Sequence, residues 1–214
     1  MITFRSALLV LFFLTAVVVT DAVAETAVTC GDTPVPSSLA VLHSSRERQQ
    51  SLARYAKRVF LQRLGFGPAV TPPSWTKDIQ SACFVTFFSR KRVIACSGGF
   101  RPRTADLGKE VAANVRQALH MDPRAGRINR AIAEEARVLI TFPGEPCPIA
   151  SPEMIDPVRE GLFVENDRSG VAIVPGEAKT ASWAYREALR RLGESDPSRV
   201  RLYVFDSWVI SGKE

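Results

Sequence analysis

Apolar residues recur every three or four positions in three stretches of the chain, and polar residues occupy the positions between them. The stretches cover residues 46–64, about 105–120 and about 181–192. This spacing places the apolar side chains on one face and is typical of amphipathic helices. Ser44 or Ser45 can cap the first stretch, and a glycine directly follows the first and third stretches. The pattern therefore predicts three helices.

Other apolar runs are short and are bounded by Gly, Pro, Asn or Asp, as strands commonly are. Two of them lie within residues 82–100, and the others cover residues 136–142, 161–165, 170–174 and 201–205. Together with the helices, these runs predict an α+β fold in which an antiparallel β-sheet has flanking helices.

The hairpin within residues 82–100 has two possible registers. A turn centred on Arg90-Lys91 makes Cys83 and Cys96 diagonal neighbours, about 7–8 Å apart, which is long for a disulfide. A turn centred one residue earlier places the two cysteines directly opposite each other. The sequence leaves both registers open.

The N-terminus has the pattern of a secretory signal peptide. Arg5 precedes an uncharged apolar run over residues 7–19, and Ala22-Val23-Ala24 supplies a cleavage site of the small-x-small type. The run is short for a membrane span, which needs about 20 residues, although an uncleaved anchor is the alternative. We therefore expect residues 1–24 to be removed by cleavage. The remaining protein would be exported, periplasmic or secreted, and would not insert stably into a membrane.

After cleavage, residues 25–45 have the Gly, Pro and Ser content of an extended lead-in, and a single domain over residues 46–211 follows. The net charge of +6 is unchanged, because the leader carries one Arg and one Asp. Such a charge suits nucleic acid, anionic lipid or an anionic polymer, but export argues against nucleic acid. Because the basic residues are scattered, a solvated surface is also an adequate explanation.

The histidines and cysteines limit the chemistry. The chain has two histidines and four cysteines, without metal-binding spacing or Cys-x-x-Cys, so we expect no metal site and no cofactor. An exported chain enters an oxidising compartment, where its cysteines can form disulfides. Four cysteines allow three pairings, among them one that includes Cys30–Cys147, and the sequence does not select one.

Cys96 is the candidate for chemistry. It lies near the end of a strand, and Gly98 and Gly99 follow, which would let a ligand approach the backbone closely. Arg101, Arg103 and a helix N-terminus come next, and positive charge there favours an anion and lowers the pKa of a thiol. A buried structural cysteine or a disulfide is the alternative explanation.

Three further residues are candidates for the same site. His120 is the available base for a nucleophilic cysteine, or else a helix-end residue that contacts the last carbonyls. Asp122 and Arg124 either pair locally or line a ligand-binding cleft.

The order of these segments resembles the AMMECR domain family, named after a gene of the AMME-syndrome chromosomal region. That family reads Phe-Val-Thr-Leu, a short turn, and Leu-Arg-Gly-Cys-Ile-Gly, where this chain has Phe-Val-Thr-Phe and Val-Ile-Ala-Cys-Ser-Gly. Asp122-Pro123-Arg124 matches a second family block, and Pro175 with Trp183 matches a third. The resemblance covers roughly residues 47–211.

The resemblance implies an α+β fold with two loosely defined subdomains that share one core. It implies no reaction, because the role of the family is poorly defined. The Arg and Gly before the family cysteine are Ile94 and Ala95 here, so an anion contact through that Arg would be lost, unless Arg101 or Arg103 replaces it. Bacterial members often accompany a Memo-like protein and a radical-type enzyme, a cytosolic partnership that the signal peptide does not fit.

Three functions follow from these residues. The first is a binding or accessory module in the cell envelope, which holds a small anionic ligand or a partner protein beside the loop of residues 96–103. The alternative is a cysteine-dependent enzyme that uses Cys96 as nucleophile, His120 as base and the backbone N–H groups near Gly98 and Gly99 as oxyanion site. The third is a purely structural role in which all four cysteines are bridged.

Overall fold

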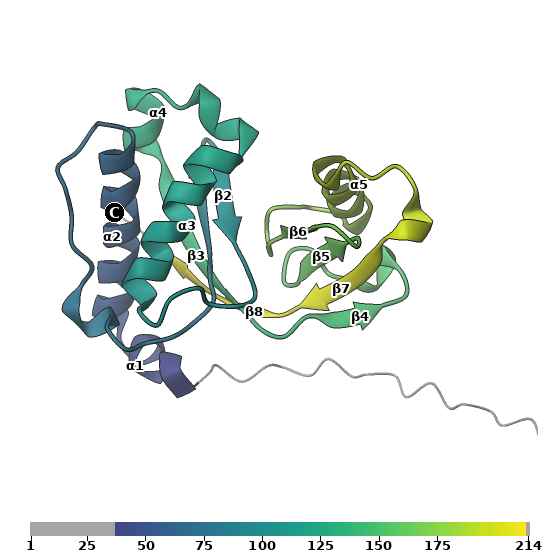
Figure 1. Ribbon diagram of the computed structural model, residues 1–214, viewed down its shortest axis with the longest axis horizontal. Coiled ribbons are helices and arrows are strands. Elements are labelled where there is room, and N and C mark those ends of the chain that lie inside the picture. Colours follow the sequence, from purple (N-terminus) through teal and green to yellow (C-terminus); the bar gives the residue numbers. More distant parts are fainter. Residues whose placement is uncertain (1–36, 213–214) are drawn as a thin grey trace, which may run out of the picture.

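The computed structural model describes residues 37–212, which form two lobes (Figure 1). We call residues 37–143 with 207–212 the large lobe and residues 144–206 the small lobe. The expected signal peptide over residues 1–24 lies outside the described residues. No helix within residues 37–212 has the length and apolar character that a membrane crossing requires.

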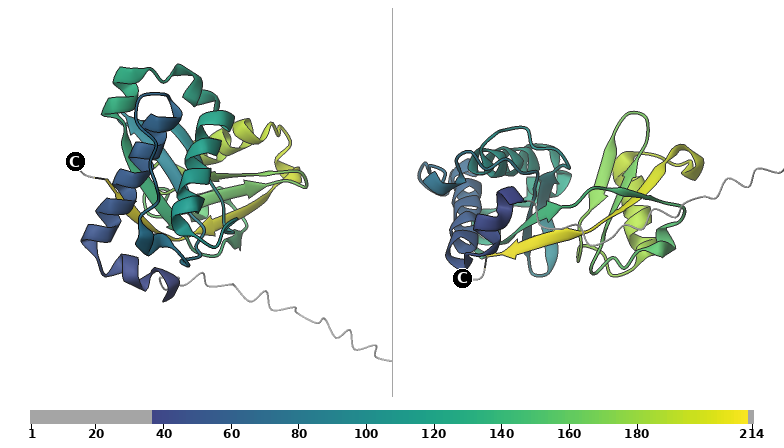
Figure 2. Two further views of the ribbon diagram at one scale, coloured as in Figure 1. Left: turned by 60° about the vertical axis from the view of Figure 1, so that its left-hand side comes forward. Right: turned by 90° about the horizontal axis from the view of Figure 1, so that it is seen from below.

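The large lobe is a four-stranded antiparallel sheet in the order β2-β1-β3-β8, covered on one face by helices (Figures 1 and 2). Its strands are β1 (Phe84–Ser89), β2 (Arg92–Gly98), β3 (Arg137–Pro143) and β8 (Ser207–Ser211). Its α-helices are α1 (Ala40–His43), α2 (Arg46–Arg63), α3 (Leu107–Met121) and α4 (Arg130–Glu135). The short 3-10 helices are η1 (Ser37–Leu39), η2 (Ser74–Thr76) and η3 (Pro123–Arg127).

The small lobe is a second antiparallel sheet, in the order β4-β7-β5-β6, with one helix packed on it. Its elements are β4 (Cys147–Ile149), η4 (Pro152–Met154), β5 (Gly161–Glu165), β6 (Gly170–Ile173), α5 (Ala181–Leu192), η5 (Pro197–Arg199) and β7 (Arg201–Phe205). The chain then returns directly from β7 to β8, which pairs with β3 in the large lobe. Two strands that are almost continuous in sequence therefore tie the lobes together.

The predicted α+β fold with antiparallel strands, flanking helices and two subdomains is confirmed. The apolar core consists of one cluster in each lobe, joined by aromatic residues at the boundary. There, Phe84 and Phe100 of the large lobe contact Phe205 of the small lobe, and Phe100 also meets Phe163 edge to face at 4.9 Å between ring centroids. Aromatic contact thus fixes how the lobes sit against each other.

The helix starts and stops follow the sequence. The Ser45 hydroxyl accepts a hydrogen bond from Arg48 N at 3.3 Å, and Asp106 caps α3 in the same way. Gly193 ends α5 with φ +69°, a conformation that favours glycine. Polar caps and glycines therefore place the ends of these helices as expected.

The extended lead-in expected over residues 25–45 is wrong for its last part. Residues 37–43 form η1 and α1 instead. Leu39 and Leu42 are fully buried in the core of the large lobe, and the side chain of Gln49 donates hydrogen bonds to Leu42 O and His43 O. Burial of two leucines gives this segment a reason to fold that its Ser-rich composition hides.

The hairpin of β1 and β2 has neither of the two expected registers. The turn is centred on Arg90-Lys91, but Phe87 pairs with Ala95 and Phe88 with Val93, so Ile94 is an extra residue in a β-bulge. A bulge moves every later residue of the strand to the other face. Cys96 therefore lies opposite Thr86, on the sheet face away from Cys83, and the two cysteines are free thiols.

Candidate functional site

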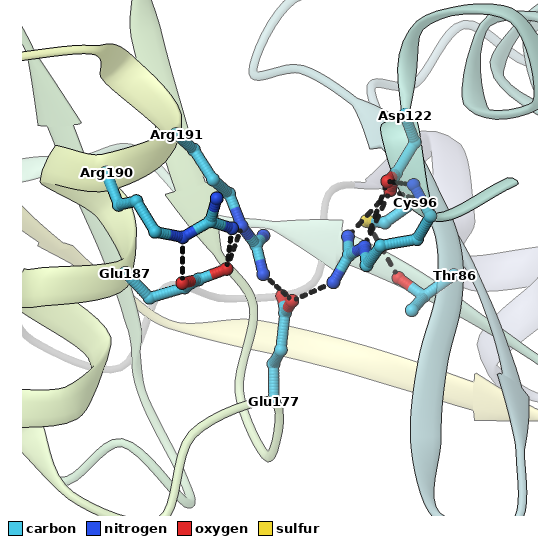
Figure 3. Close-up of polar contacts among 8 residues, drawn as sticks. Thr86, Cys96, Asp122, Glu177, Glu187, Arg190 and Arg191 are labelled. Atoms are coloured by element: carbon cyan, nitrogen blue, oxygen red, sulfur yellow. Dashed lines mark hydrogen bonds and ion pairs between the residues drawn. The ribbon is translucent and has the colours of Figure 1, made fainter. Parts of the chain in front are cut away.

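Cys96 sits in the middle of the lobe boundary, on the face of β2 that is turned toward the small lobe (Figure 3). Its Sγ lies 3.1 Å from Thr86 Oγ1, and its backbone N donates to Asp122 Oδ2 at 2.9 Å. Burial raises the pKa of the Cys96 thiol to about 12, and the Glu177 carboxylate acts in the same direction. The thiol is therefore held in its protonated form near neutral pH.

His120 lies elsewhere. It is exposed in the last turn of α3, in a surface hollow that Arg103, Arg116 and Gln117 also line. Within residues 37–212 it makes no hydrogen bond to Cys96. The structure does not bring together the nucleophile and base that the sequence suggested.

Hydrogen bonds from Arg103 to residues of α3 hold the loop that follows Cys96. Nε of Arg103 donates to Glu110 Oε1 at 3.1 Å, and its two terminal nitrogens donate to Gln117 and Asn114. Because the Glu110 side chain is 2% exposed, Arg103 neutralises a buried carboxylate. Arg101 is an exposed residue of this loop.

Gly98 and Gly99 differ in whether a side chain would fit at their position. A Cβ added at Gly98 would come within 2.4 Å of Phe84 Cα, so the close cross-strand approach explains this glycine. A Cβ at Gly99 would meet nothing within 4 Å. The predicted roles of Gly98 and Gly99 in ligand binding stay predictions.

Asp122 and Arg124 do come together, beside Cys96. Arg124 Nε donates to Asp122 Oδ1 at 2.9 Å, and Arg124 Nη2 donates to Asp122 Oδ2 at 2.6 Å. Desolvation alone would raise the pKa of Asp122, but its hydrogen bonds from Arg124 and from Cys96 N outweigh that effect, and the pKa is lowered. Asp122 is thus a carboxylate that accepts from both the β2 backbone and the η3 guanidinium.

Arg124 also reaches across to the small lobe. Its Nη1 donates to Glu177 Oε1 at 3.0 Å, and Arg191 Nη2 of α5 donates to the same oxygen at 2.7 Å (Figure 3). The Glu177 side chain is 1% exposed, and its Oε2 is buried without a hydrogen-bond partner among the described residues. We call Asp122, Arg124, Glu177 and Arg191 the inter-lobe ion bridge.

The ion bridge continues on α5. Arg191 Nε donates to Glu187 Oε1 at 2.8 Å, and Arg190 Nη2 donates to the same oxygen at 2.7 Å. These hydrogen bonds, foremost those from Arg190, lower the pKa of Glu187 to about 2. Together with Glu187 and Arg190, the inter-lobe ion bridge contains three acidic and three basic side chains, so their formal charges balance.

A basic groove opens next to the ion bridge, with a volume of about 1000 Å³. Its arginines come from four elements or turns: Arg90, Arg92, Arg124, Arg127 and Arg190. Glu135 is the acidic residue of the lining, and Arg90 pairs with it at 3.5 Å. Arg92 and Arg127 are exposed and have no acidic partner within residues 37–212.

This groove has little signal in the sequence. Only Arg124 among its arginines was a predicted site residue, because β2, η3 and α5 are far apart in the sequence and meet only in the folded chain. The adjacent basic residues Arg90-Lys91-Arg92 were the one visible signal, and they were assigned to a turn. Within the described residues, no group of three or more His, Cys, Asp or Glu side chains could hold a metal ion.

Comparisons with known proteins agree with this architecture. A family model described as AMMECR1 matches residues 37–203. The chain is also similar to the crystal structure of uncharacterized protein PH0010 from Pyrococcus horikoshii, with a TM-score of 0.60 and 18% sequence identity. That similarity covers 76% of this chain and 90% of that chain, and it concerns the fold alone. No curated protein matches the chain.

Proposed function

The chain belongs to the AMMECR1 family, and from that premise we propose that it is a binding or accessory module whose basic groove holds an anionic ligand. The observation that carries the proposal is the pair of exposed guanidinium groups, Arg92 and Arg127, that have no acidic partner among the described residues. Guanidinium groups bind carboxylates and phosphates through two parallel hydrogen bonds.

The electrostatics of the groove support an anion. Five arginines line it, and Arg90, Arg124 and Arg190 are paired with carboxylates, so Arg92 and Arg127 supply the positive excess of the groove. Positive charge gathered along a concave surface raises the local concentration of anions and speeds their association. The ion bridge fixes Arg124 at one wall, because two carboxylates hold its guanidinium.

The alternative function, a cysteine-dependent enzyme, has weaker support. A nucleophilic cysteine needs a stabilised thiolate, whereas burial raises the pKa of Cys96 to about 12. His120 makes no hydrogen bond to Cys96 within residues 37–212 that would make it the base. A binding role needs neither condition.

We place this module in the cell envelope, because residues 1–24 have the pattern of a signal peptide. Fractionation of cells that express the full chain tests this location. Recovery of a shortened protein outside the cytoplasm is the expected result, and full-length protein confined to the cytoplasm would contradict it.

Titration calorimetry with citrate and with inorganic phosphate tests the binding function. We expect citrate to bind at low salt, the double variant Arg92→Gln/Arg127→Gln to bind at least tenfold more weakly, and added salt to weaken binding. The matched control is Arg54→Gln/Arg58→Gln, which removes two exposed arginines from α2. Absence of binding, or equal losses in both double variants, would refute the groove as the anion site.

A further inference from the structure

The groove is too large for one small anion. Pockets of about 300–1000 Å³ hold ligands of drug size, and this groove, with about 1000 Å³, lies at the upper end of that range. The lining also includes apolar side chains, namely those of Val93, Ile94, Ile128 and Ile132. A ligand that fills it must therefore offer apolar groups as well as negative charge.

The tip of the β1–β2 hairpin borders the groove and has an unusual composition. Arg90 and Lys91 have φ of 48° and 65°, in the left-handed region that Gly and Asn adopt far more readily. Two long basic side chains are therefore a poor choice for the turn itself. Strained residues of this kind persist where they have another task, and the tip places Arg90 and Arg92 in the lining of the groove.

The cations of the lining are all arginines. A guanidinium has a planar set of donors that matches a carboxylate, and it sheds water more easily than a lysine ammonium does. A lining that combines arginines with apolar side chains fits a ligand that combines carboxylates with apolar groups. A lipid surface is flat and a polyphosphate lacks apolar groups, so neither matches the apolar part of the lining.

We propose that the basic groove binds an acidic peptide segment of a partner protein, in which carboxylate side chains alternate with apolar ones. This inference rests on the proposed function, because it names the class of anion that the groove recognises. Arg92 and Arg127 pair with carboxylates, and Ile94 and Ile132 contact the apolar side chains between them.

Calorimetry with three probes tests the inference on the purified full chain. The first is a peptide of the type Asp-Leu-Glu-Leu-Asp with blocked ends, the second is Asp-Gly-Glu-Gly-Asp of equal charge, and the third is polyphosphate. We expect the leucine peptide to bind at least tenfold more tightly than the glycine peptide. Arg92→Gln/Arg127→Gln should weaken both peptides, whereas Arg54→Gln/Arg58→Gln should change neither.

A variant of the apolar lining separates the two levels of the proposal. Ile132→Ser should reduce the preference for the leucine peptide and leave citrate binding unchanged, and a thermal melt confirms that the variant is folded. Equal affinity for both peptides, or tighter binding of polyphosphate than of the leucine peptide, would overturn the peptide inference while citrate binding stands. Failure of citrate, phosphate and both peptides to bind would overturn the proposed function itself.

Discussion

At the scale of single residues, Cys96 and Arg124 show how surroundings decide chemistry. Cys96 was the candidate nucleophile because basic residues follow it in the sequence, yet its sulfur faces Thr86 and the negatively charged Glu177. Arg124 was a candidate for ligand binding, and it holds two carboxylates from different lobes while it lines the groove. The neighbours in space, not those in sequence, set the charge state of the thiol.

The first prediction concerns the reactivity of Cys96. With its pKa raised to about 12, the thiolate is scarce at pH 7.5, and we expect alkylation by iodoacetamide at least about tenfold slower than for a free thiol of pKa about 8.5. Mass spectrometry of the labelled peptide measures the rate, and the variant Cys96→Ser controls for Cys83. A rate equal to that of the free thiol would restore the enzyme hypothesis.

A second prediction follows from the pKa of Glu187. Its folded value is about 2, below the ordinary 4.5, so the stability that it contributes is present above pH 4.5 and is lost as pH falls toward 2. Glu187→Gln should flatten the loss of unfolding free energy over this window, as followed by urea melts. Glu134→Gln, at an exposed pair with Arg130, is the control and should leave the slope unchanged.

At the scale of elements, the β1–β2 hairpin has a strained backbone at its tip, and the same tip lines the basic groove. The bulge at Ile94 turns Cys96 toward the small lobe, and the tip carries Arg90 and Lys91 in the left-handed region. Such positions cost a residue with a side chain about 1–2 kcal/mol relative to glycine. The bulge thus places Cys96 at the lobe boundary, and the turn places Arg90 and Arg92 in the lining of the groove.

The third prediction exchanges the turn residues. Arg90→Asn/Lys91→Gly should raise the unfolding free energy by about 1–2 kcal/mol, because Asn and Gly adopt the left-handed region with little strain. The same variant should bind the leucine peptide more weakly, since Arg90 lines the groove. Chemical melts and calorimetry measure the two effects. A stabilised variant with unchanged peptide affinity would show that the hairpin tip does not contribute to peptide binding.

At the scale of the whole molecule, the two lobes meet through an aromatic contact and through the inter-lobe ion bridge that Figure 3 shows. The aromatic contact of Phe84, Phe100, Phe163 and Phe205 is non-polar. The bridge through Arg124 and Glu177 is directional, and Glu177 Oε2 has no partner among the described residues. Removing one arginine from such a bridge leaves buried carboxylates with fewer cationic partners, which costs more than the pair contributes when intact.

The fourth prediction removes the centre of the bridge. Arg124→Ala removes a cationic partner from Asp122 and Glu177, whose side chains are 7% and 1% exposed in the intact protein, and we expect a loss of about 3 kcal/mol of unfolding free energy. Urea melts at pH 7 provide the measurement. Arg130→Ala, at the exposed pair with Glu134, should change stability by less than about 1 kcal/mol. Similar small effects of both variants would show that the bridge is not a structural tie.

Tertiary burial explains where the sequence analysis was wrong. Residues 37–43 were expected to be extended, and they form η1 and α1 because Leu39 and Leu42 are buried in the core of the large lobe. The strand predicted over residues 136–142 ends at Pro143 as β3, and the further strand β4 forms because it pairs with β7. Pairing with a distant strand and burial against a distant helix leave no local signal in the residues themselves.

The sequence by itself determined the α+β class and the three long helices with their polar caps and terminal glycines. These features depend on apolar spacing and on local hydrogen bonds, which neighbouring residues specify. The tertiary structure alone decided the strand register after Ile94, the separation of Cys96 from His120, and the gathering of arginines into one groove. Those depend on contacts between residues far apart along the chain, which only the packing of the two lobes brings together.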